Sequence, residues 1–347
     1  MNKKAKIIAI AIVVIIIILM YPIIFFSSTN QKNIEFKVKR NTTEEQFNLI
    51  TKKSLGISFP FGIYKLAKIA GYKLSPCRID IPPKTNILNF ILLLRKNRHQ
   101  TVNLVITSGV YKKQIIEKIT KATAIEKDEL EMVFADYSAL KKFNINEYTW
   151  PAIFVPNTYN VSYKIDVEGL FFRLVSEQNK FWNSASRISK SEKQKLTPLE
   201  VITVASIVEK ESSKVSEYGK IAAVYINRLR KGMKLQADPT IVFIKGIAER
   251  VRGDEDLNRQ SPYNTYLNKG LPPGPICIPS VQAIDSVLNY TYCDYLFFCA
   301  KSDFSGYHLF EKSYSKHKMN AKKFHIALNE QEKIRAKKRG INPLNFD

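Results

Sequence analysis

One apolar segment near the N-terminus constrains this chain more than any other feature. Residues Ile7 to Phe26 form an uninterrupted run of 20 residues without a charged side chain, directly after a lysine-rich start. A run of this length can cross a bilayer as a helix. A cleaved signal peptide has a shorter apolar region and a small-x-small site, whereas Phe26 leads into Ser27 and Ser28 here. We therefore expect a retained membrane anchor.

The anchor places the rest of the chain on one side of the membrane, because no second apolar segment of this length follows it. The positive-inside rule does not give the side, since Lys32, Lys37, Lys39 and Arg40 balance the basic residues that precede the run. The segment therefore predicts a tethered protein, either an enzyme or a binding protein.

The composition is that of a folded, cationic protein. The chain has 347 residues, of which 45% are hydrophobic, and this is enough for one large or two ordinary domains. Its formal net charge of +23 favours acidic polymers and anionic lipid surfaces. The charge is spread along the sequence, and no known nucleic-acid-binding motif occurs, so we expect no nucleic-acid partner.

The cysteines do not form a metal-binding pattern. Cys77, Cys277, Cys293 and Cys299 show no CxxC spacing and do not pair with the four histidines, so structural zinc is not expected. They can serve as small hydrophobic residues, whereas a disulfide such as one between Cys293 and Cys299 requires an oxidising compartment. The sequence leaves both alternatives open.

Strand and helix patterns alternate through the N-terminal third, which predicts an α+β fold. Thr42 and Thr43 precede Glu44 and Glu45, an arrangement typical of a capped helix start. Strands are expected at residues 34–38, 77–81 and 102–107, and helices at residues 47–53, 61–70, 84–94 and 111–119.

The remainder of the chain combines helices with two irregular segments. Residues 148–159 mix aromatic residues, prolines and amides without periodicity, which predicts a shaped loop. Residues 258–279 contain prolines and glycines that fix the backbone, and long stiff loops of this kind often line sites. Helices are expected at residues 167–181, 198–213 and 220–230, a hairpin at 295–300 and 307–310, and a solvated basic helix from Lys333 onward.

The segment TPLEVITVASIVEKESS, residues 197–213, predicts a buried helix with acidic residues near its C-terminal end. Thr197 is a typical N-cap residue, and Pro198 is a typical first helical residue. The interior is apolar on most faces, which indicates burial, and Glu209 and Glu211 lie where the helix dipole disfavours negative charge. Burial and the dipole raise a carboxyl pKa, so such a glutamic acid could protonate a glycosidic oxygen.

The helix alone does not identify the acting glutamate. Residues two positions apart are rotated by about 200°, so Glu209 and Glu211 cannot both face one cleft. The apolar face is centred near Val201 and Val208, and each glutamate lies to one side of it. The alternative is that both are solvated or paired with a cation such as Lys210, as most helical glutamates are.

Several polar and aromatic motifs follow this helix, in a mixture typical of sugar binding. Each has a plain structural explanation: Asp238 can cap a turn, Asn264 can form an Asx-turn, and Tyr266 can pack in a core. Their joint order carries more information than any one of them. The motifs are residues 227–229 (NRL), 235–240 (LQADPT), 263–266 (YNTY) and 270–276 (GLPPGPI).

The order of ASIVEKES, INRL, LQADPT, SPYNTY, GLPPGPI and the GYHLF hairpin resembles the MltG/YceG-like endolytic murein transglycosylases, over about Trp150 to His317. Residues 33 to about 100 resemble the LysM-like subdomain of that family in element order. The resemblance implies a cytoplasmic tail and transmembrane helix in residues 1–28. It also implies a LysM-like α/β subdomain in residues 29–100 and a mixed α+β catalytic domain in residues 101–347.

The resemblance also implies the chemistry. The second glutamate of the family's EKE run is catalytic and corresponds to Glu211, which would protonate the glycosidic oxygen beyond N-acetylmuramic acid and then accept the proton of that sugar's 6-hydroxyl. The product is a 1,6-anhydro end, and an intramolecular nucleophile removes the need for a second carboxylate. No metal or organic cofactor is implied. The candidate substrate-binding residues are Glu209, Asn227, Gln236, Asp238, Thr240, Tyr263, Asn264 and Tyr266.

By the same resemblance, the substrate is the nascent peptidoglycan glycan strand, and the catalytic domain lies on the outer, periplasmic face of the plasma membrane. Penicillin-binding proteins or other cell wall synthases would be neighbours. The chain departs from the family pattern at WPAIFVPNTY and at the turn Ile106–Gly109, so we expect differences in the subsites rather than in the chemistry.

Two other functions fit the same residues. A hydrolase on this substrate would use Asp238 as the second carboxylate and water as the nucleophile, and would leave reducing ends. A non-catalytic glycan-binding scaffold is suggested by the LysM-like part and the cationic composition. Analysis of the products of peptidoglycan digestion distinguishes these functions from a transglycosylase.

Overall fold

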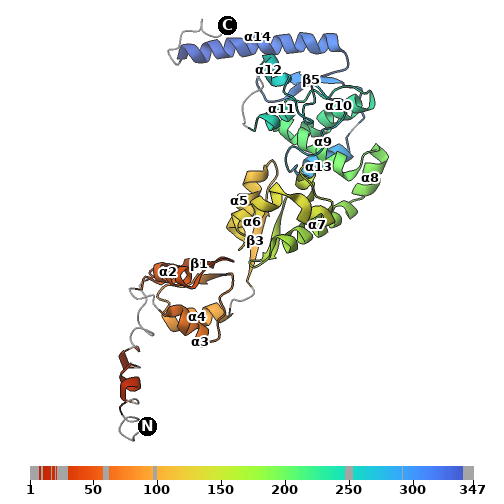
Figure 1. The fold of residues 1–347 in the computed structure, drawn as a ribbon. Helices are drawn as coiled ribbons and strands as arrows, with labels where there is room; N and C mark the ends of the chain where they lie inside the picture. Colours follow the sequence, from red (N-terminus) through yellow and green to blue (C-terminus); the bar gives the residue numbers. More distant parts are fainter. Residues whose placement is uncertain are drawn as a thin grey trace. The chain divides into compact units, whose positions relative to one another are not determined.

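The computed structural model describes residues 8, 11–16, 18–19, 21, 30–57, 62–96, 100–246, 253–290 and 292–338 (Figure 1). The expected anchor, Ile7 to Phe26, lies partly outside this set, and those of its residues that are described are helical. Within the described part, no helix is both long and apolar enough to cross a membrane. The anchor therefore stays a prediction.

The chain forms two compact units and has the expected mixture of helices and strands. The division follows packing, so the functional boundary expected at residue 100 stays a prediction. The first unit consists of Met1–Leu104, Ile116–Met132 and Thr158–Leu170, and the second of Val105–Ile115, Val133–Asn157 and Phe171–Asp347.

The first unit is organised around an antiparallel pair of strands. β1 (Ile34–Val38) pairs with β2 (Cys77–Ile81), and both strands have the predicted bounds. Phe36 lies opposite Ile79 in this ladder, and both side chains are fully buried. Their core is completed by residues of α2 (Glu44–Leu55), α3 (Ile63–Ile69) and α4 (Ile87–Lys96).

Helix α2 begins at the predicted capped start and extends two residues beyond the expected end at residue 53. The Thr43 hydroxyl accepts a hydrogen bond from the Gln46 backbone N–H (3.2 Å), and Gln46 Oε1 accepts one from the Thr43 N–H (2.9 Å). This reciprocal pair satisfies two N–H groups that the first turn cannot bond internally. Gly56 ends the helix in the left-handed conformation, with φ of 65°.

A second two-stranded sheet corrects one prediction. β3 (Thr101–Ile106) was expected and is followed by α5 (Lys112–Ala122), but its partner β4 (Asn157–Ser162) lies partly in the segment predicted to be an irregular loop. Residues 148–156 contain only the short 3-10 helix η2 (Trp150–Ile153). Between the sheet strands lie α6 (Lys127–Ala135) and the 3-10 helix η1 (Tyr137–Phe143).

The second unit is built around α9 (Pro198–Glu211). Every residue from Val201 to Val208 is buried, which confirms the expectation from its apolar sequence. Thr197 forms a capping box with Glu200 at the N-terminal end. The helices packed against α9 are α8 (Arg187–Gln194), α10 (Tyr218–Arg230), α11 (Asp238–Lys245) and α13 (Val281–Leu288), beside which α9 is drawn in green (Figure 1).

A long irregular loop joins α12 (Gly253–Leu257) to α13, as the prolines and glycines predicted. The Ile276 backbone N–H donates a hydrogen bond to the Ser206 hydroxyl of α9 (3.0 Å). At Gly274, an added Cβ would lie 2.0 Å from the carbonyl oxygen of Tyr148. The loop can approach residue 148 this closely only because residue 274 has no side chain.

The predicted hairpin near the C-terminus is confirmed. β5 (Phe297–Ala300) pairs antiparallel with β6 (His308–Glu311), and Gly306 in the turn has a φ of 78°. The helix expected from Lys333 begins much earlier, because α14 spans Tyr314–Lys338. α14 packs against both strands of the hairpin.

The four cysteines are free thiols, so the Cys293–Cys299 disulfide considered above is not formed. Cys77 and Cys277 are buried in the two cores, whereas Cys293 and Cys299 are half-buried. Burial raises the pKa of the Cys277 thiol to about 12.

The Gly274 contact predicts a specific loss of stability. We expect Gly274→Ala to destabilise the second unit by about 2–3 kcal/mol, because the Tyr148 carbonyl must move away from the new methyl group. Gly219→Ala is the matched control: no atom lies within 4 Å of the added Cβ, and alanine is favoured over glycine in a helix by up to about 1 kcal/mol. Urea unfolding of both variants checks this, and equal stabilities would contradict it.

Candidate active site

The two glutamates at the end of α9 have different environments. The Glu209 carboxylate accepts hydrogen bonds from the Ser280 backbone N–H (3.2 Å) and the Ser280 hydroxyl (2.5 Å). Ser280 is the N-cap of α13, where a negative charge is favourable. Glu211 instead accepts a hydrogen bond from the Tyr225 hydroxyl of α10. Glu209 therefore joins two helices, whereas Glu211 is available for chemistry.

Lys210 occupies a third direction. Its Nζ donates to the carbonyl oxygen of Gly109 (2.7 Å) and lies 4.6 Å from the centre of the Tyr111 ring. Consecutive helical residues differ by about 100° in direction, so the EKE sequence reaches three separate parts of the second unit.

Glu211 lies in a cavity of about 540 Å³ within the second unit. The walls come from the end of α9, from α10, from the segment at the start of α11, from the hairpin and from α14. The lining residues are Glu211, Tyr225, Arg228, Leu235, Gln236, Asp238, Tyr266, Phe298, Cys299, Ala300, His308, Tyr314, His317, Ala321, Phe324 and His325.

The surroundings of Glu211 hold the pKa of its carboxyl group near neutral pH. The pKa is raised from the ordinary 4.5 to about 7, and burial is the largest influence. The hydrogen bond from Tyr225 and the positive charge of Arg228 lower the pKa, whereas the negative charge of Asp238 adds to the rise. A carboxyl group with this pKa can both give and accept a proton near pH 7.

Asp238 and Tyr266 form a second polar pair in the cavity. Asp238 is the first residue of α11, and its carboxylate accepts a hydrogen bond from the Tyr266 hydroxyl. Burial and the neighbouring carboxylate raise the pKa of Tyr266 well above its ordinary value, so the hydroxyl remains a donor. The cavity thus contains two carboxyl groups, and each accepts a hydrogen bond from a tyrosine hydroxyl.

Arg228 fixes the backbone beside this pair. Its guanidinium donates to the carbonyl oxygens of Leu296 (2.7 Å) and Leu235 (2.8 Å) and to Gln236 Oε1 (3.2 Å). Gln236 has a φ of 51°, which is uncommon for a residue other than glycine. Strain of this kind is often found at functional sites.

His308 contributes an imidazole that is held by a buried carboxylate. Its Nδ1 lies 2.8 Å from Glu217 Oε2, and its backbone N–H donates to Glu217 Oε1 (2.9 Å). Glu217 ends the 3-10 helix η3 (Val215–Glu217) and is 6% exposed. The pair ties the hairpin to the start of α10 and fixes the orientation of the ring.

Four of the nine predicted site residues line this cavity: Glu211, Gln236, Asp238 and Tyr266. The others have partners elsewhere. Asn227 donates to the carbonyl oxygens of Cys293 (2.6 Å) and Tyr295 (3.0 Å), and the fully buried Thr240 donates to Ala237 O (2.7 Å). Asn264 is also fully buried and donates to the carbonyl oxygens of Leu257 (2.9 Å) and Arg259 (2.8 Å). Glu209 binds Ser280, and Tyr263 lines a different cavity.

Tyr225, Arg228 and His308 were not predicted as site residues. The spacing of Tyr225 and Arg228, three residues apart on α10, places them on one helix face and could have indicated the first two. The NRL motif contains Arg228, but its neighbour Asn227 was the residue predicted to bind substrate. His308 lies in the GYHLF motif, which was used for the resemblance but not for the site, whereas no local signal in the sequence indicates the residues of α14.

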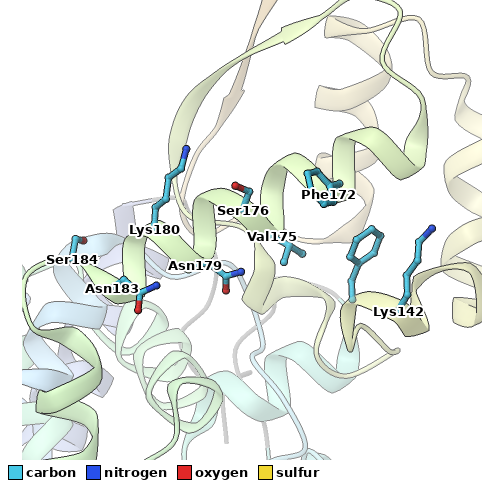
Figure 2. Close-up of a pocket in the computed structure, with 9 residues that line it drawn as sticks. Lys142, Phe172, Val175, Ser176, Asn179, Lys180, Asn183 and Ser184 are labelled. Carbon is cyan, nitrogen blue, oxygen red and sulfur yellow. The ribbon is translucent and has the colours of Figure 1, made fainter.

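A larger hollow of about 740 Å³ lies along α7 (Val167–Asn183). Figure 2 shows Phe172, Ser176 and Asn179 on this helix, with Lys142 across the hollow. None of the nine described residues that line it is acidic. It therefore offers no carboxyl group for acid–base chemistry.

Comparisons with known proteins agree on one family. The model of the YceG-like family matches residues 36–323. The endolytic murein transglycosylase of Bacillus subtilis (strain 168) is 32% identical over 226 residues, which cover 63% of this chain and 60% of the relative. The protein of that name from Streptococcus pneumoniae serotype 2 is 35% identical over 164 residues, 46% of this chain and 28% of the relative. The chain thus spans less than two thirds of either relative.

A solved structure shows the same fold. The yceG-like protein from Listeria monocytogenes superimposes with a TM-score of 0.54 at 24% sequence identity. The superposition covers 83% of this chain and 98% of the other.

The raised pKa of Glu211 predicts a pH-dependent stability. Below pH 4.5 the group is protonated in both folded and unfolded chains. Between pH 4.5 and 7 only the unfolded chain loses the proton, so stability falls by up to about 3 kcal/mol as pH rises. Glu211→Gln removes this loss, so its stability relative to wild type should be more favourable at pH 8 than at pH 4.5. Calorimetric unfolding at both pH values measures it; a difference independent of pH would contradict the raised pKa.

Proposed function

The chain belongs to the YceG-like family, and we propose that it is a peptidoglycan lytic transglycosylase in which Glu211 is the catalytic acid and base. The observation that carries this proposal is the position of Glu211 in a cavity of about 540 Å³, with a pKa of about 7. Curated relatives named endolytic murein transglycosylase support the same activity.

The proposed reaction needs only one carboxyl group to move protons. Protonated Glu211 gives its proton to the oxygen of the MurNAc–GlcNAc bond as the C–O bond breaks. The resulting carboxylate accepts the proton of the 6-hydroxyl of the same MurNAc ring, whose oxygen bonds to C1. The sugar ends as 1,6-anhydro-MurNAc, and Glu211 is protonated again. No water enters, and the attacking group is already part of the substrate.

The neighbours of Glu211 would stabilise both of its protonation states, the acid for the first step and the carboxylate for the second. Burial and the charge of Asp238 favour the protonated form that starts the reaction. The hydrogen bond from Tyr225 and the charge of Arg228 favour the carboxylate formed midway. Asp238, held by Tyr266, would act through its charge and by contacting sugar hydroxyls rather than by activating water.

The remaining parts of the chain suggest where the enzyme acts. We propose that Ile7 to Phe26 anchors it in the plasma membrane with the catalytic domain on the periplasmic face; the charge-free run of 20 residues supports this. The β1-α2-α3-β2 unit has the element order on which the LysM-like prediction depends. A role in cell wall assembly beside penicillin-binding proteins or other synthases is part of the same proposal.

Replacing the two glutamates separately tests the catalytic assignment. Glu211→Gln should lower the rate of glycan cleavage by about 10² to 10⁴ because it removes the transferable proton. Glu209→Gln should lose less, because Glu209 binds Ser280 outside the cavity. Mass spectrometry of peptidoglycan digested by the full-length proteins should show anhydromuramyl ends from the wild type. Reducing ends would indicate a hydrolase, and equal activity of Glu211→Gln would indicate a non-catalytic scaffold.

The Tyr225 hydrogen bond predicts a shift in the pH profile. Since this bond stabilises the carboxylate, Tyr225→Phe should raise the pKa of Glu211 above 7. The reaction starts from protonated Glu211, so the alkaline limb of kcat/KM should move to higher pH by about one unit. A limb that stays in place would mean that another group controls it.

A further inference from the structure

A second cavity, of about 610 Å³, lies in the same compact unit as the Glu211 cavity. The proposed chemistry does not use it, although it takes in Tyr263, which the sequence suggested as a cleft residue. Five of the twelve described residues that line it are aromatic: Tyr111, Tyr148, Trp150, Phe243 and Tyr263.

The aromatic rings are fixed by packing, yet part of their surface is open. The Phe243 and Tyr263 ring centres are 4.7 Å apart, and those of Tyr148 and Tyr263 are 6.3 Å apart. Tyr263 is 8% exposed, whereas Tyr111 is 38% exposed. Lys210 Nζ lies over the Tyr111 ring, 4.6 Å from its centre. The cavity therefore presents flat apolar surfaces that need little ordering when a ligand binds.

Polar groups lie at the edge of these surfaces. Lys113, Gln114 and Glu147 are exposed and line the cavity, so they supply both donors and acceptors. Lys112 is held over the rings of Phe134 (5.4 Å) and Trp150 (6.0 Å). An apolar face with a polar rim matches a pyranose ring, which has C–H groups on its faces and hydroxyl and acetamido groups around its edge.

The cavity is close to the catalytic one along a single helix. Asp238, at the first position of α11, lines the Glu211 cavity, whereas Val242, in the middle of that helix, and its C-cap residue Gly246 line the second. At 1.5 Å per residue, these positions are about 6–12 Å apart. Lys210, which contacts Tyr111, is the neighbour of Glu211 in sequence. The α11 backbone positions that line the two cavities are therefore within about 12 Å of each other, a separation that one extended polymer can span.

We propose that the second cavity is a glycan subsite that binds a sugar ring of the same strand, beyond the bond that Glu211 cleaves. This inference rests on the proposed function, since it takes the strand as the shared ligand. Its consequence is a preference for long strands, because a short fragment occupies only the catalytic cavity.

Binding can be tested without cleavage. In the full-length Glu211→Gln protein, calorimetric titration with peptide-free glycan strands of increasing length should show tighter binding once a strand reaches the second cavity. Tyr111→Ala should then weaken long-strand binding about tenfold, the contribution of one stacked aromatic ring, and Tyr111→Phe should restore it. Val242→Trp, which adds bulk at another residue that lines the cavity, should weaken binding similarly.

A matched control separates this subsite from a general effect of surface aromatics. Phe172 is 68% exposed and lines the other hollow (Figure 2), so Phe172→Ala should bind long strands like its parent. Equal losses for Phe172→Ala and Tyr111→Ala would overturn the inference. So would losses seen only with strands that carry stem peptides, because the cavity would then bind peptide.

The cleavage assay distinguishes failure of the subsite from failure of the proposed function. With Glu211 present, Tyr111→Ala should lower the ratio of kcat/KM on long strands to that on the shortest cleaved strand by about tenfold. An unchanged ratio in an active enzyme would refute the subsite alone. A wild type that cleaves no strand would refute the proposed function, while the titration would still report on the cavity.

Discussion

Burial of α9 on every side is the constraint on which the second unit depends. A helix whose residues from Val201 to Val208 are all enclosed cannot turn about its axis without exposing apolar surface. Its two polar interior residues do not disturb this, because the Thr203 hydroxyl donates to Leu199 O (2.8 Å) and the Ser206 hydroxyl to Thr203 O (2.7 Å). The directions of the three residues that end the helix are therefore set by the core.

The fixed end of α9 also explains how one short sequence combines structural and chemical roles. Glu209 is placed at the N-terminus of α13 and Lys210 at the Gly109 carbonyl, and both contacts hold neighbouring segments against α9. Only Glu211 enters the cavity, where burial destabilises its charge. The contacts of Glu209 and Lys210, the two residues before Glu211, keep Glu211 in that position. The stability of the core and the raised pKa of Glu211 therefore have a common origin.

Sequence patterns predicted the elements whose signals are local. β1, β2 and α9 follow from alternation, capping residues and apolar length. β4 was missed because its alternating residues follow a stretch of prolines and aromatics, and α11 was missed because Asp238-Pro239 was read as a turn although proline is common in the first turn of a helix.

The roles of the site residues were harder to predict from the sequence than the elements that carry them. Gln236, Asp238 and Tyr266 do line the Glu211 cavity, but Asn227 and Asn264, of similar polarity, bind backbone carbonyls instead. Which role an amide takes depends on partners distant in the sequence, and these are known only once the chain is folded. The burial of the cysteines is also a result of folding, and it bears on the compartment in which the enzyme is proposed to act. Thiol–disulfide exchange requires a thiolate, and burial raises the pKa of Cys77, Cys277 and Cys299. These three thiols are therefore poor nucleophiles, and the described fold is held together without a disulfide bond.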